Sequence, residues 1–193
     1  MRKVFRFLYP VIILAAICLV VSLALSSTNM ITKNKIEKIN NENREKAMAR
    51  VLKAESYEEK TFDANGKEIT YYVASDSGNI TGYIFITGAN GYGGKVEVMT
   101  AVLPDKTVKA VEILDVSGET PGLGQNAAKE DFYGQYAGKS GKLTVVKSNP
   151  DSNEIKAVTG ATITSTGVTN AVNEALSYSN AIIKTQEGEN VEK

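Results

Sequence analysis

A hydroxyl-rich stretch near the C-terminus is the first place in the sequence where chemistry could occur. Residues 159–165 read TGATITS, in which four of the seven side chains carry a hydroxyl and none is charged. The stretch lies between a β-branched run ending near Val158 and a segment of helical periodicity, so its backbone N–H groups can converge ahead of a helix N-terminus. Unpaired N–H groups and the helix dipole favour a bound phosphate there. A plain helix start, with Thr164 or Ser165 as the N-cap, is the simpler explanation and the one that physics alone favours.

A second loop, SGETPGLGQN (117–126), could bring an apolar side chain to such a site. Thr120-Pro121-Gly122-Leu123 is typical of a type II turn, because proline fixes φ at the second position and glycine supplies a positive φ at the third. The turn pushes Leu123 outward, where it packs either on the protein itself or on the flat face of a ligand. A third loop, GANGYGGK (88–95), has four glycines in eight residues and is typical of a sharp structural turn.

The composition narrows the chemistry that these loops can support. The 193-residue chain has equal numbers of acidic and basic residues, which does not suit a nucleic-acid binder. It contains no histidine and a single cysteine, which removes the usual zinc sites, haem ligation and histidine-dependent catalytic triads. We therefore expect no metal site and no catalytic residue, and we expect a bound cofactor to supply the chemistry.

The N-terminus has the pattern of a membrane anchor. After three basic residues within the first six positions, residues 8–25 form an uncharged apolar run that is long enough to span a bilayer core of roughly 30 Å. A cleaved signal peptide is the alternative, since Ala24-Leu25-Ser26 resembles a cleavage site, but the run is longer than a typical signal sequence. The basic residues predict a cytoplasmic N-terminus and an extracytoplasmic body. We assign residues 1–26 to a single-pass anchor in the cell membrane.

Residues 27–55 lead from the anchor into the rest of the chain. Between Thr32 and Glu55, apolar residues recur three or four positions apart, which predicts a helix. This helix serves either as a linker or, alternatively, as a partner-binding element.

The central region changes to the pattern of a β-sheet, with β-branched and aromatic runs separated by turn residues. The predicted strands are 69–74, 79–87, 95–103, 107–116, 143–148 and 154–158. Leu103-Pro104-Asp105-Lys106 is typical of a hairpin turn. Helices are predicted from Asn126 to about Tyr136 and after Ser165. Strands in the middle with helices at the edges favour an α+β fold with a mainly antiparallel sheet over a doubly wound parallel one. We assign residues 56–187 to this domain and 188–193 to a polar tail.

These motifs together resemble a known family. TGATITS resembles the flavinylation motif, (S/T)-G-A-T, of the G subunit of Rnf-type ion-translocating electron transport complexes and of the related C subunit of sodium-pumping NADH:quinone reductases. The segments GYGG (91–94), ETPGLG (119–124) and FYGQYAGKS (132–140) resemble further landmarks of the family in the same order. The short length and the ETPGLG context favour the Rnf protein.

The resemblance implies an FMN-binding domain that carries its cofactor covalently. In the family the last threonine of the motif is esterified to the FMN phosphate, and the matching residue here is Thr162. The family motif usually begins with an aspartate three positions before the first hydroxyl residue, where this chain has Lys156. The surroundings of the FMN follow from the same resemblance: Thr159, Gly160, Ala161 and Thr164 shape a phosphate cradle, and Thr120, Gly122 and Leu123 approach the isoalloxazine, with Glu119 either orienting the loop or meeting the ring.

The implied function is an electron relay within a membrane complex that links ferredoxin oxidation and NAD reduction to ion translocation. Its implied partners are the integral membrane and redox subunits of that complex, and a flavin transferase for maturation. The alternative is an extracytoplasmic FMN-binding reductase or sensor module that works outside such a complex.

Overall fold

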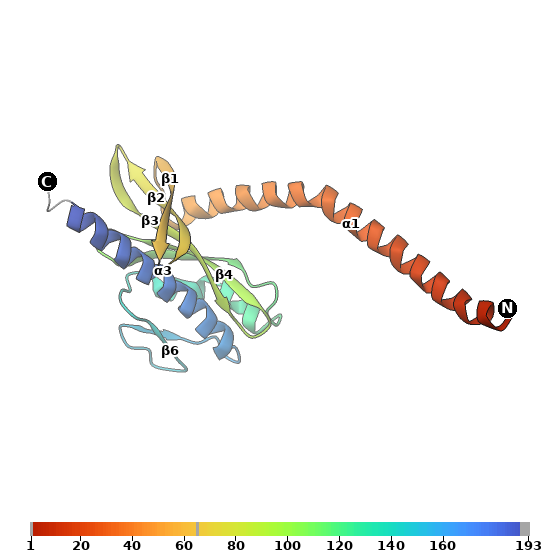
Figure 1. The fold of residues 1–193 in the computed structure, drawn as a ribbon. Helices are drawn as coiled ribbons and strands as arrows, with labels where there is room; N and C mark the ends of the chain where they lie inside the picture. The colour runs from red at the N-terminus through yellow and green to blue at the C-terminus, as the bar shows by residue number, and fades with distance from the viewer. Residues whose placement is uncertain (1, 65, 190–193) are drawn as a thin grey trace. The chain divides into compact units, whose positions relative to one another are not determined.

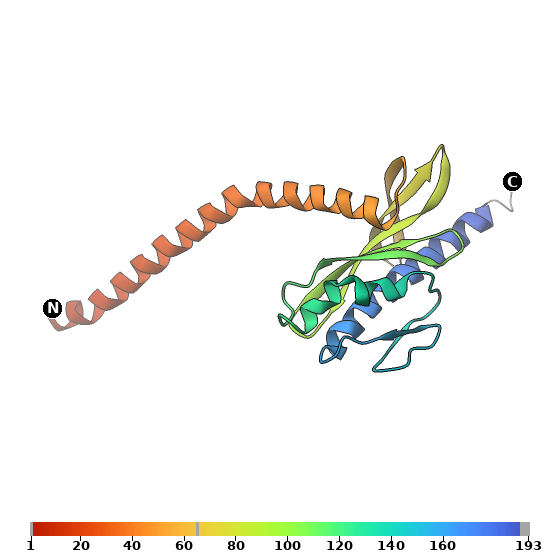
Figure 2. The same ribbon diagram turned by 180° about the vertical axis from the view of Figure 1, so that it is seen from behind.

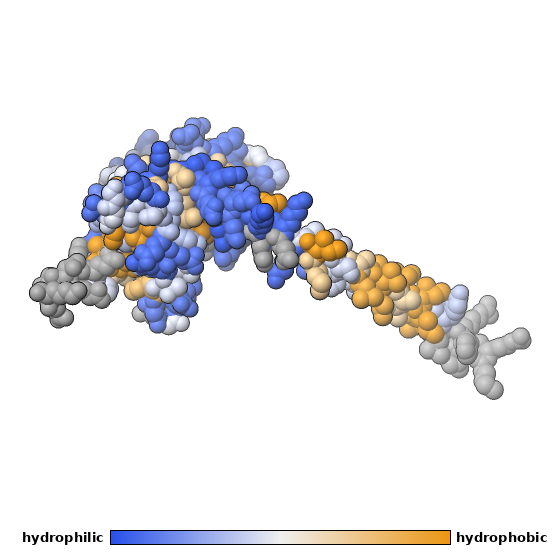
Figure 3. Space-filling view, turned by 90° about the horizontal axis from the view of Figure 1, so that it is seen from above, coloured by the Kyte–Doolittle hydropathy of each residue, from blue (hydrophilic) through white to orange (hydrophobic). Residues whose placement is uncertain are grey.

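The computed structural model describes residues 2–64 and 66–189, and the chain divides into two compact units, Met1–Arg44 and Glu45–Lys193. The first unit lies within α1 (Arg2–Val51), and its stretch Tyr9–Lys33 is long and apolar enough to cross a membrane. Figure 3 shows apolar side chains covering much of this helix. The predicted anchor and linker are therefore parts of one helix, which ends at Val51 rather than at Glu55.

A five-stranded antiparallel sheet forms the centre of the second unit (Figure 1). The strands follow one another in space in the order of the chain, so that each pairs with the next. They are β1 (Ser56–Ala64), β2 (Lys67–Asp76), β3 (Asn79–Asn90), β4 (Lys95–Val102) and β5 (Val108–Asp115). Two short strands, β6 (Thr144–Val146) and β7 (Glu154–Lys156), form a separate parallel pair. The α+β fold with a mainly antiparallel sheet is confirmed.

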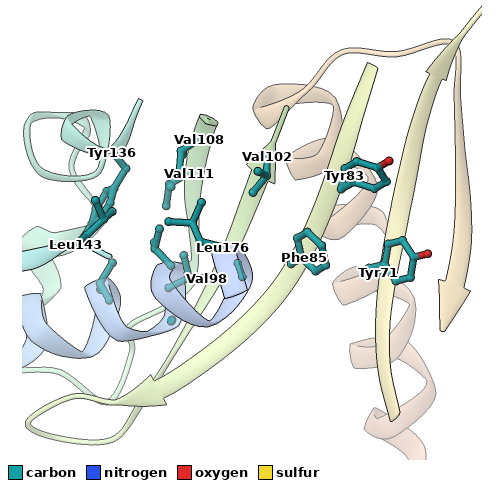
Figure 4. Close-up of a cluster of buried hydrophobic side chains, with 14 of the residues drawn as sticks. Tyr71, Tyr83, Phe85, Val98, Val102, Val108, Val111, Tyr136, Leu143 and Leu176 are labelled. Atoms are coloured by element: carbon teal, nitrogen blue, oxygen red, sulfur yellow. The ribbon is translucent and has the colours of Figure 1, made fainter. Parts of the chain in front are cut away.

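One face of the sheet is covered by α3 (Thr162–Glu189), which lies against β3 and β4 (Figures 1 and 2). The main hydrophobic core fills this interface. Figure 4 shows Phe85 of the sheet and Leu176 of α3 within it, with Tyr136 and Leu143 at one end. The tight packing of this core fixes the position of α3 on the sheet.

The opposite face of the sheet carries a second, smaller core. Ile84 belongs to it, although its neighbour Phe85 belongs to the core beneath α3, because successive side chains of a strand point to opposite faces. The C-terminal end of α1 packs here through Met48 and Val51. Arg50 adds a bidentate interaction with Glu112 of β5, in which its Nε and Nη2 donate to the two carboxylate oxygens, and these hydrogen bonds raise the pKa of Arg50. The end of the predicted linker helix is thus part of the domain core.

In two further places the secondary structure differs from the prediction. Strand β1 was not predicted, because its sequence SYEEKTFDA is mostly charged or polar and none of its positions at the sheet edge is fully buried. The helix predicted from Asn126 to Tyr136 is broken into three short pieces: η1 (Gly124–Ala128), α2 (Glu130–Tyr133) and η2 (Gly134–Tyr136). The break between the first two falls at Lys129, whose backbone is extended.

Candidate functional site

The hydroxyl-rich stretch forms a tight turn that leads directly into α3. Gly160 has a φ of +78°, which glycine adopts readily, and the helix begins at Thr162 rather than after Ser165. The N-cap position therefore falls on Ala161, whose side chain has no oxygen to accept a hydrogen bond from the first turn. The first bond of the helix is donated by the Ser165 N–H to the Ala161 carbonyl. The N–H groups of residues 162–164 are consequently available to an anion at the start of a 28-residue helix.

The hydroxyls of this stretch have different environments. Ser165 is buried, and its Oγ accepts a hydrogen bond from the Val158 N–H at 3.0 Å and donates to the Ala161 carbonyl at 2.9 Å. Thr164 is buried too, and its hydroxyl donates to the Glu119 carboxylate. Both are inside the first turn of the helix, so the prediction that either is the N-cap was wrong. Thr162, by contrast, is exposed.

Thr162 opens onto a cavity of about 580 Å³, which we call the site cavity. The loops around residues 119–124 and 160–164 supply most of its wall, although about 40 residues separate them in the sequence. Seven of the nine predicted site residues line it: Glu119, Thr120, Leu123, Gly160, Ala161, Thr162 and Thr164. Gly122 and Thr159 do not. The structure therefore brings the two sequence motifs together at one place.

The loop that carries Leu123 has the predicted conformation. The Leu123 N–H donates to the Thr120 carbonyl at 3.1 Å, and Gly122 has a φ of +76°, as a type II turn requires. Gly122 thus shapes the turn without lining the site cavity. Leu123 remains 44% exposed and faces the cavity, where it also approaches Gly160. Its side chain is available to pack on a ligand.

Two further apolar residues of the wall were not predicted. Tyr92 is 71% exposed and Ile163 is 56% exposed, and both line the site cavity with Leu123. Tyr92 belongs to the glycine-rich loop, which the local sequence indicated as a turn and the family resemblance included as GYGG (91–94), without a role for Tyr92. Ile163 is the one large side chain in TGATITS, and that contrast is the signal that could have identified it. Together with Leu123 they give the cavity an apolar mouth.

Glu119 lies between the loops that form the cavity. It is only 3% exposed, and its Oε1 accepts a hydrogen bond from the Gly93 N–H at 2.9 Å while its Oε2 accepts from the Thr164 hydroxyl. A Cβ atom placed on Gly91 or Gly124 would lie 2.4 or 2.6 Å from one of these carboxylate oxygens. The glycines therefore let three loops close around one carboxylate. Glu119 both orients the loops and contributes to the cavity wall.

The first half of α3 is held in place by buried polar contacts. The Tyr136 hydroxyl and Thr169 Oγ are 2.8 Å apart, and burial raises the pKa of Tyr136. Asn173 makes paired hydrogen bonds with the backbone of Leu143 at 2.8 and 2.9 Å. Thr87 of β3 donates to the Ala171 carbonyl at 2.8 Å. These contacts fix the helix whose N-terminus faces the site cavity.

A smaller hollow of about 320 Å³ adjoins the other side of the 157–160 turn, and we call it the lysine hollow. Thr159, Lys156 and Lys129 line it, with Asp131 and Gln135. The Gln135 side chain accepts a hydrogen bond from the Lys156 N–H at 2.8 Å and donates to the Lys156 carbonyl at 3.2 Å. Lys156, at the position where the family motif has aspartate, therefore has a hydrogen-bonded backbone next to the site cavity. Within residues 2–64 and 66–189, no group of three or more His, Cys, Asp or Glu side chains is placed to hold a metal ion.

Comparison with known proteins agrees with this geometry. Residues 91–177, which include every loop of the site cavity, match the FMN-binding domain family. The chain is 43% identical over 113 residues to the G subunit of the proton-translocating ferredoxin:NAD(+) oxidoreductase complex of Clostridium ljungdahlii, a match that covers 58% of this chain and 60% of that protein. It is 37% identical over 183 residues to the G subunit of the Na(+)-translocating ferredoxin:NAD(+) oxidoreductase complex of Acetobacterium woodii, over 86% of this chain and 87% of that protein.

Two solved structures are also similar. The C subunit of the Na(+)-translocating NADH-quinone reductase of Parabacteroides distasonis is 27% identical, with a TM-score of 0.47 over 55% of this chain and 60% of that one. Shewanella oneidensis NqrC is 24% identical, with a TM-score of 0.49 over 60% and 61% of the two chains. The Acetobacterium match, by its identity and its length, decides the family: the chain belongs to the G subunits of the ion-translocating oxidoreductase complexes.

Proposed function

We propose that this protein is a membrane-anchored covalent flavoprotein that relays electrons within an Rnf-type complex, with FMN esterified to Thr162. The observation that carries the proposal is the position of Thr162. This residue is exposed, it begins α3, and it lines the site cavity, whereas the hydroxyls of Thr164 and Ser165 are buried and hydrogen-bonded. Thr159 is exposed too, but it lines the smaller lysine hollow, so Thr162 is the one exposed hydroxyl of TGATITS that lines the site cavity.

The residues around the cavity fit FMN. A volume of about 580 Å³ lies within the usual range for small-molecule sites. The N–H groups at the start of α3 suit a phosphodiester, which remains anionic after esterification. The apolar mouth formed by Tyr92, Leu123 and Ile163 suits a flat ring. When bound, FMN supplies reversible electron transfer, and the chain's own residues hold and orient it.

The covalent link is tested by co-expressing the full-length chain with a flavin transferase and separating it on a denaturing gel. We expect yellow-green fluorescence to remain with the wild-type chain and to be absent from Thr162→Ala. Thr166→Ala is the matched control, because Thr166 is an exposed threonine one turn further along α3, and its hydroxyl donates to the Thr162 carbonyl. Its fluorescence should equal that of the wild type. A wild-type chain whose intact mass equals that of the bare polypeptide, despite active transferase, contradicts the proposal.

Membership of a complex rests on the anchor and on the relatives. The related proteins from Clostridium and Acetobacterium are named as subunits of ferredoxin:NAD(+) oxidoreductase complexes. We infer that the partners here are likewise integral membrane and redox subunits, and that the α1 stretch Tyr9–Lys33 confines the flavin domain beside them. Purification of the chain from native membranes in mild detergent should recover these partners. Recovery of the flavoprotein alone would favour an FMN-binding reductase or sensor that works by itself.

The orientation that we propose places the N-terminus in the cytoplasm and the FMN domain outside it. Cys18 is the single cysteine and lies in the apolar stretch. A Cys18→Ala background with Ser152→Cys, an exposed position of the FMN domain, therefore gives one reporter thiol. A membrane-impermeant maleimide should label it in intact cells or spheroplasts. Labelling only after lysis would show that the FMN domain lies in the cytoplasm.

A further inference from the structure

Glu119 is an isolated charge in the wall of the site cavity. Of the described residues that line the cavity, Glu119 alone carries a carboxyl group and none is Lys or Arg. Because Glu119 is 3% exposed, water can screen its charge only weakly. A cofactor in this cavity therefore experiences a carboxylate that no cation of the cavity wall balances.

The hydrogen bonds of Glu119 are those of an ionised carboxylate. Both oxygens accept, one from the Gly93 N–H at 2.9 Å and the other from the Thr164 hydroxyl. Both donors are neutral, so they stabilise the negative charge without cancelling it. Gly91 and Gly124 leave room for the carboxylate here, because a Cβ atom on either residue would collide with one of its oxygens.

We propose that Glu119 is a buried anion whose charge lowers the reduction potential of the flavin in this cavity. This inference rests on the proposed function. In the step concerned, two electrons come from a reduced redox centre of a neighbouring protein of the complex and one proton comes from solvent, which leaves the flavin ring with one additional negative charge. The electrons then leave to the next centre and the proton returns to solvent. Glu119 is neither oxidised nor consumed, but its charge repels the charge that reduction adds.

The dimensions of the cavity give the expected size of the effect. A cavity of this volume measures about 10 Å across, so a ring held in it lies within about 10 Å of the Glu119 carboxylate. At that separation and an effective dielectric constant of about 20, one unit charge changes the equilibrium constant for reduction by about tenfold. For a two-electron couple, a tenfold change corresponds to about 30 mV.

The test is a redox titration of the full-length flavinylated protein in detergent. Glu119→Gln removes the charge and keeps an acceptor oxygen, and we expect its equilibrium constant for reduction to rise about tenfold. Glu130→Gln is the charge-matched control, because Glu130 is exposed and lines neither the site cavity nor the lysine hollow. It should leave the constant unchanged. Glu119→Asp keeps the charge and should restore most of the wild-type value.

Thr164→Val separates charge from positioning. It breaks the contact between Thr164 and Glu119 but leaves the carboxylate in place, so it should change the constant much less than Glu119→Gln. Equal shifts in the two variants would show that loop position, not charge, sets the potential, and would overturn the proposal. An unchanged constant in Glu119→Gln would overturn it as well.

The covalent fluorescence of each variant keeps this test distinct from the test of the proposed function. A wild-type chain without bound flavin refutes the proposed function, whereas flavin-bearing variants with unshifted potentials refute only the role of Glu119. If Glu119→Gln does not retain flavin, Glu119→Ser is the second measurement, because it removes the same charge with a smaller neutral side chain. It should also raise the constant for reduction. No change in that variant would also overturn the proposal.

Discussion

The site cavity and the lysine hollow adjoin the same turn but differ in nearly every other property. The 157–160 turn passes between them, so that Thr159 lines the lysine hollow while Gly160 lines the site cavity. The site cavity is the larger, at about 580 against 320 Å³. Its mouth is apolar and the one acid among its described wall residues is the buried Glu119, whereas the lysine hollow presents Lys129, Lys156 and Asp131.

The difference indicates a division of roles between the two surfaces. A helix N-terminus and an apolar mouth suit a permanently held, flat, anionic cofactor. Exposed charged side chains on a fixed backbone suit a transient encounter with another protein, because exposed charges act on orientation and association rate. We therefore expect changes in the site cavity to alter how FMN is held, and changes in the lysine hollow to alter how it is attached.

The largest effect should come from Gly93→Ala. A Cβ atom on Gly93 would lie 2.0 Å from the Gly118 carbonyl oxygen, so the 91–94 loop must move and the Gly93 N–H must leave Glu119. We expect a loss of about 1–3 kcal/mol of stability, as for other overpacked sites. The initial rate of covalent FMN incorporation should fall to less than about a tenth of the wild-type rate, which corresponds to at least about 1.4 kcal/mol of activation free energy. Thermal unfolding and gel fluorescence measure the two effects.

Gly94→Ala is the control in the same loop. The nearest atom to a Cβ on Gly94 is 3.8 Å away, and its φ is not positive, so alanine fits without strain. Stability should stay within about 0.5 kcal/mol of the wild type. If both variants bind flavin equally well, the close approach of Gly93 to Gly118 is not needed for the site.

A moderate effect is expected from Leu123→Ala. Leu123 is partly exposed, so the variant should fold normally, but an apolar contact to the ring is lost. The loss of about 1 kcal/mol of apolar burial should weaken the binding of free FMN about fivefold. This Kd is measured in the Thr162→Ala background by quenching of flavin fluorescence. Ile80→Ala is matched in exposure, at 43% against 44%, and lies at the start of β3 outside the cavity. An equal loss of FMN affinity in both variants would show that Leu123 makes no specific contact with FMN.

A smaller effect, on rate only, is expected from Lys156→Asp. This change restores the aspartate of the family motif in the lysine hollow without touching the site cavity. At limiting flavin transferase, we expect FMN incorporation to become about twofold faster, an effect of about 0.4 kcal/mol on the activation free energy. The final extent of incorporation should not change. Lys129→Asp alters the charge of the same hollow equally, so an equal acceleration there would show that net charge, not the residue at position 156, is what matters.

The sequence predicted the local turn conformations of the site loops better than the contacts between those loops. The turn at Thr120 to Leu123 depends on local chemistry, namely a proline followed by a glycine, and was therefore correct. The role of Glu119 was left open between two alternatives, because its partners Gly93 and Thr164 are 26 and 45 residues away along the chain. A local sequence pattern cannot predict contacts between residues that lie so far apart along the chain.

The same reasoning explains the errors in secondary structure. Strands β2 to β5 have β-branched and aromatic residues on at least one buried face and were identified. Strand β1 is held mainly by its pairing with β2, so its own sequence has little periodicity. The start of α3 was placed too late because Ser165 is a good N-cap residue in isolation, whereas here its hydroxyl bonds the Val158 N–H from inside the first turn.

The smallest effect that we expect concerns Asp115, which lies outside both hollows at the start of the loop that carries Glu119. Its Oδ1 accepts a hydrogen bond from the Ser117 N–H at 2.7 Å, and this bond lowers the pKa of Asp115 below its usual value. Because the folded-state pKa is the lower one, Asp115 stabilises the fold above its ordinary pKa, and this stability is lost as the pH falls through the lowered value. Asp115→Asn should therefore lower Tm by about 2 °C at neutral pH, and the difference should close as the pH falls through the lowered pKa. A Tm difference that persists in acid would show that the asparagine perturbs the turn itself. The stabilisation of this loop would then not depend on the charge of Asp115.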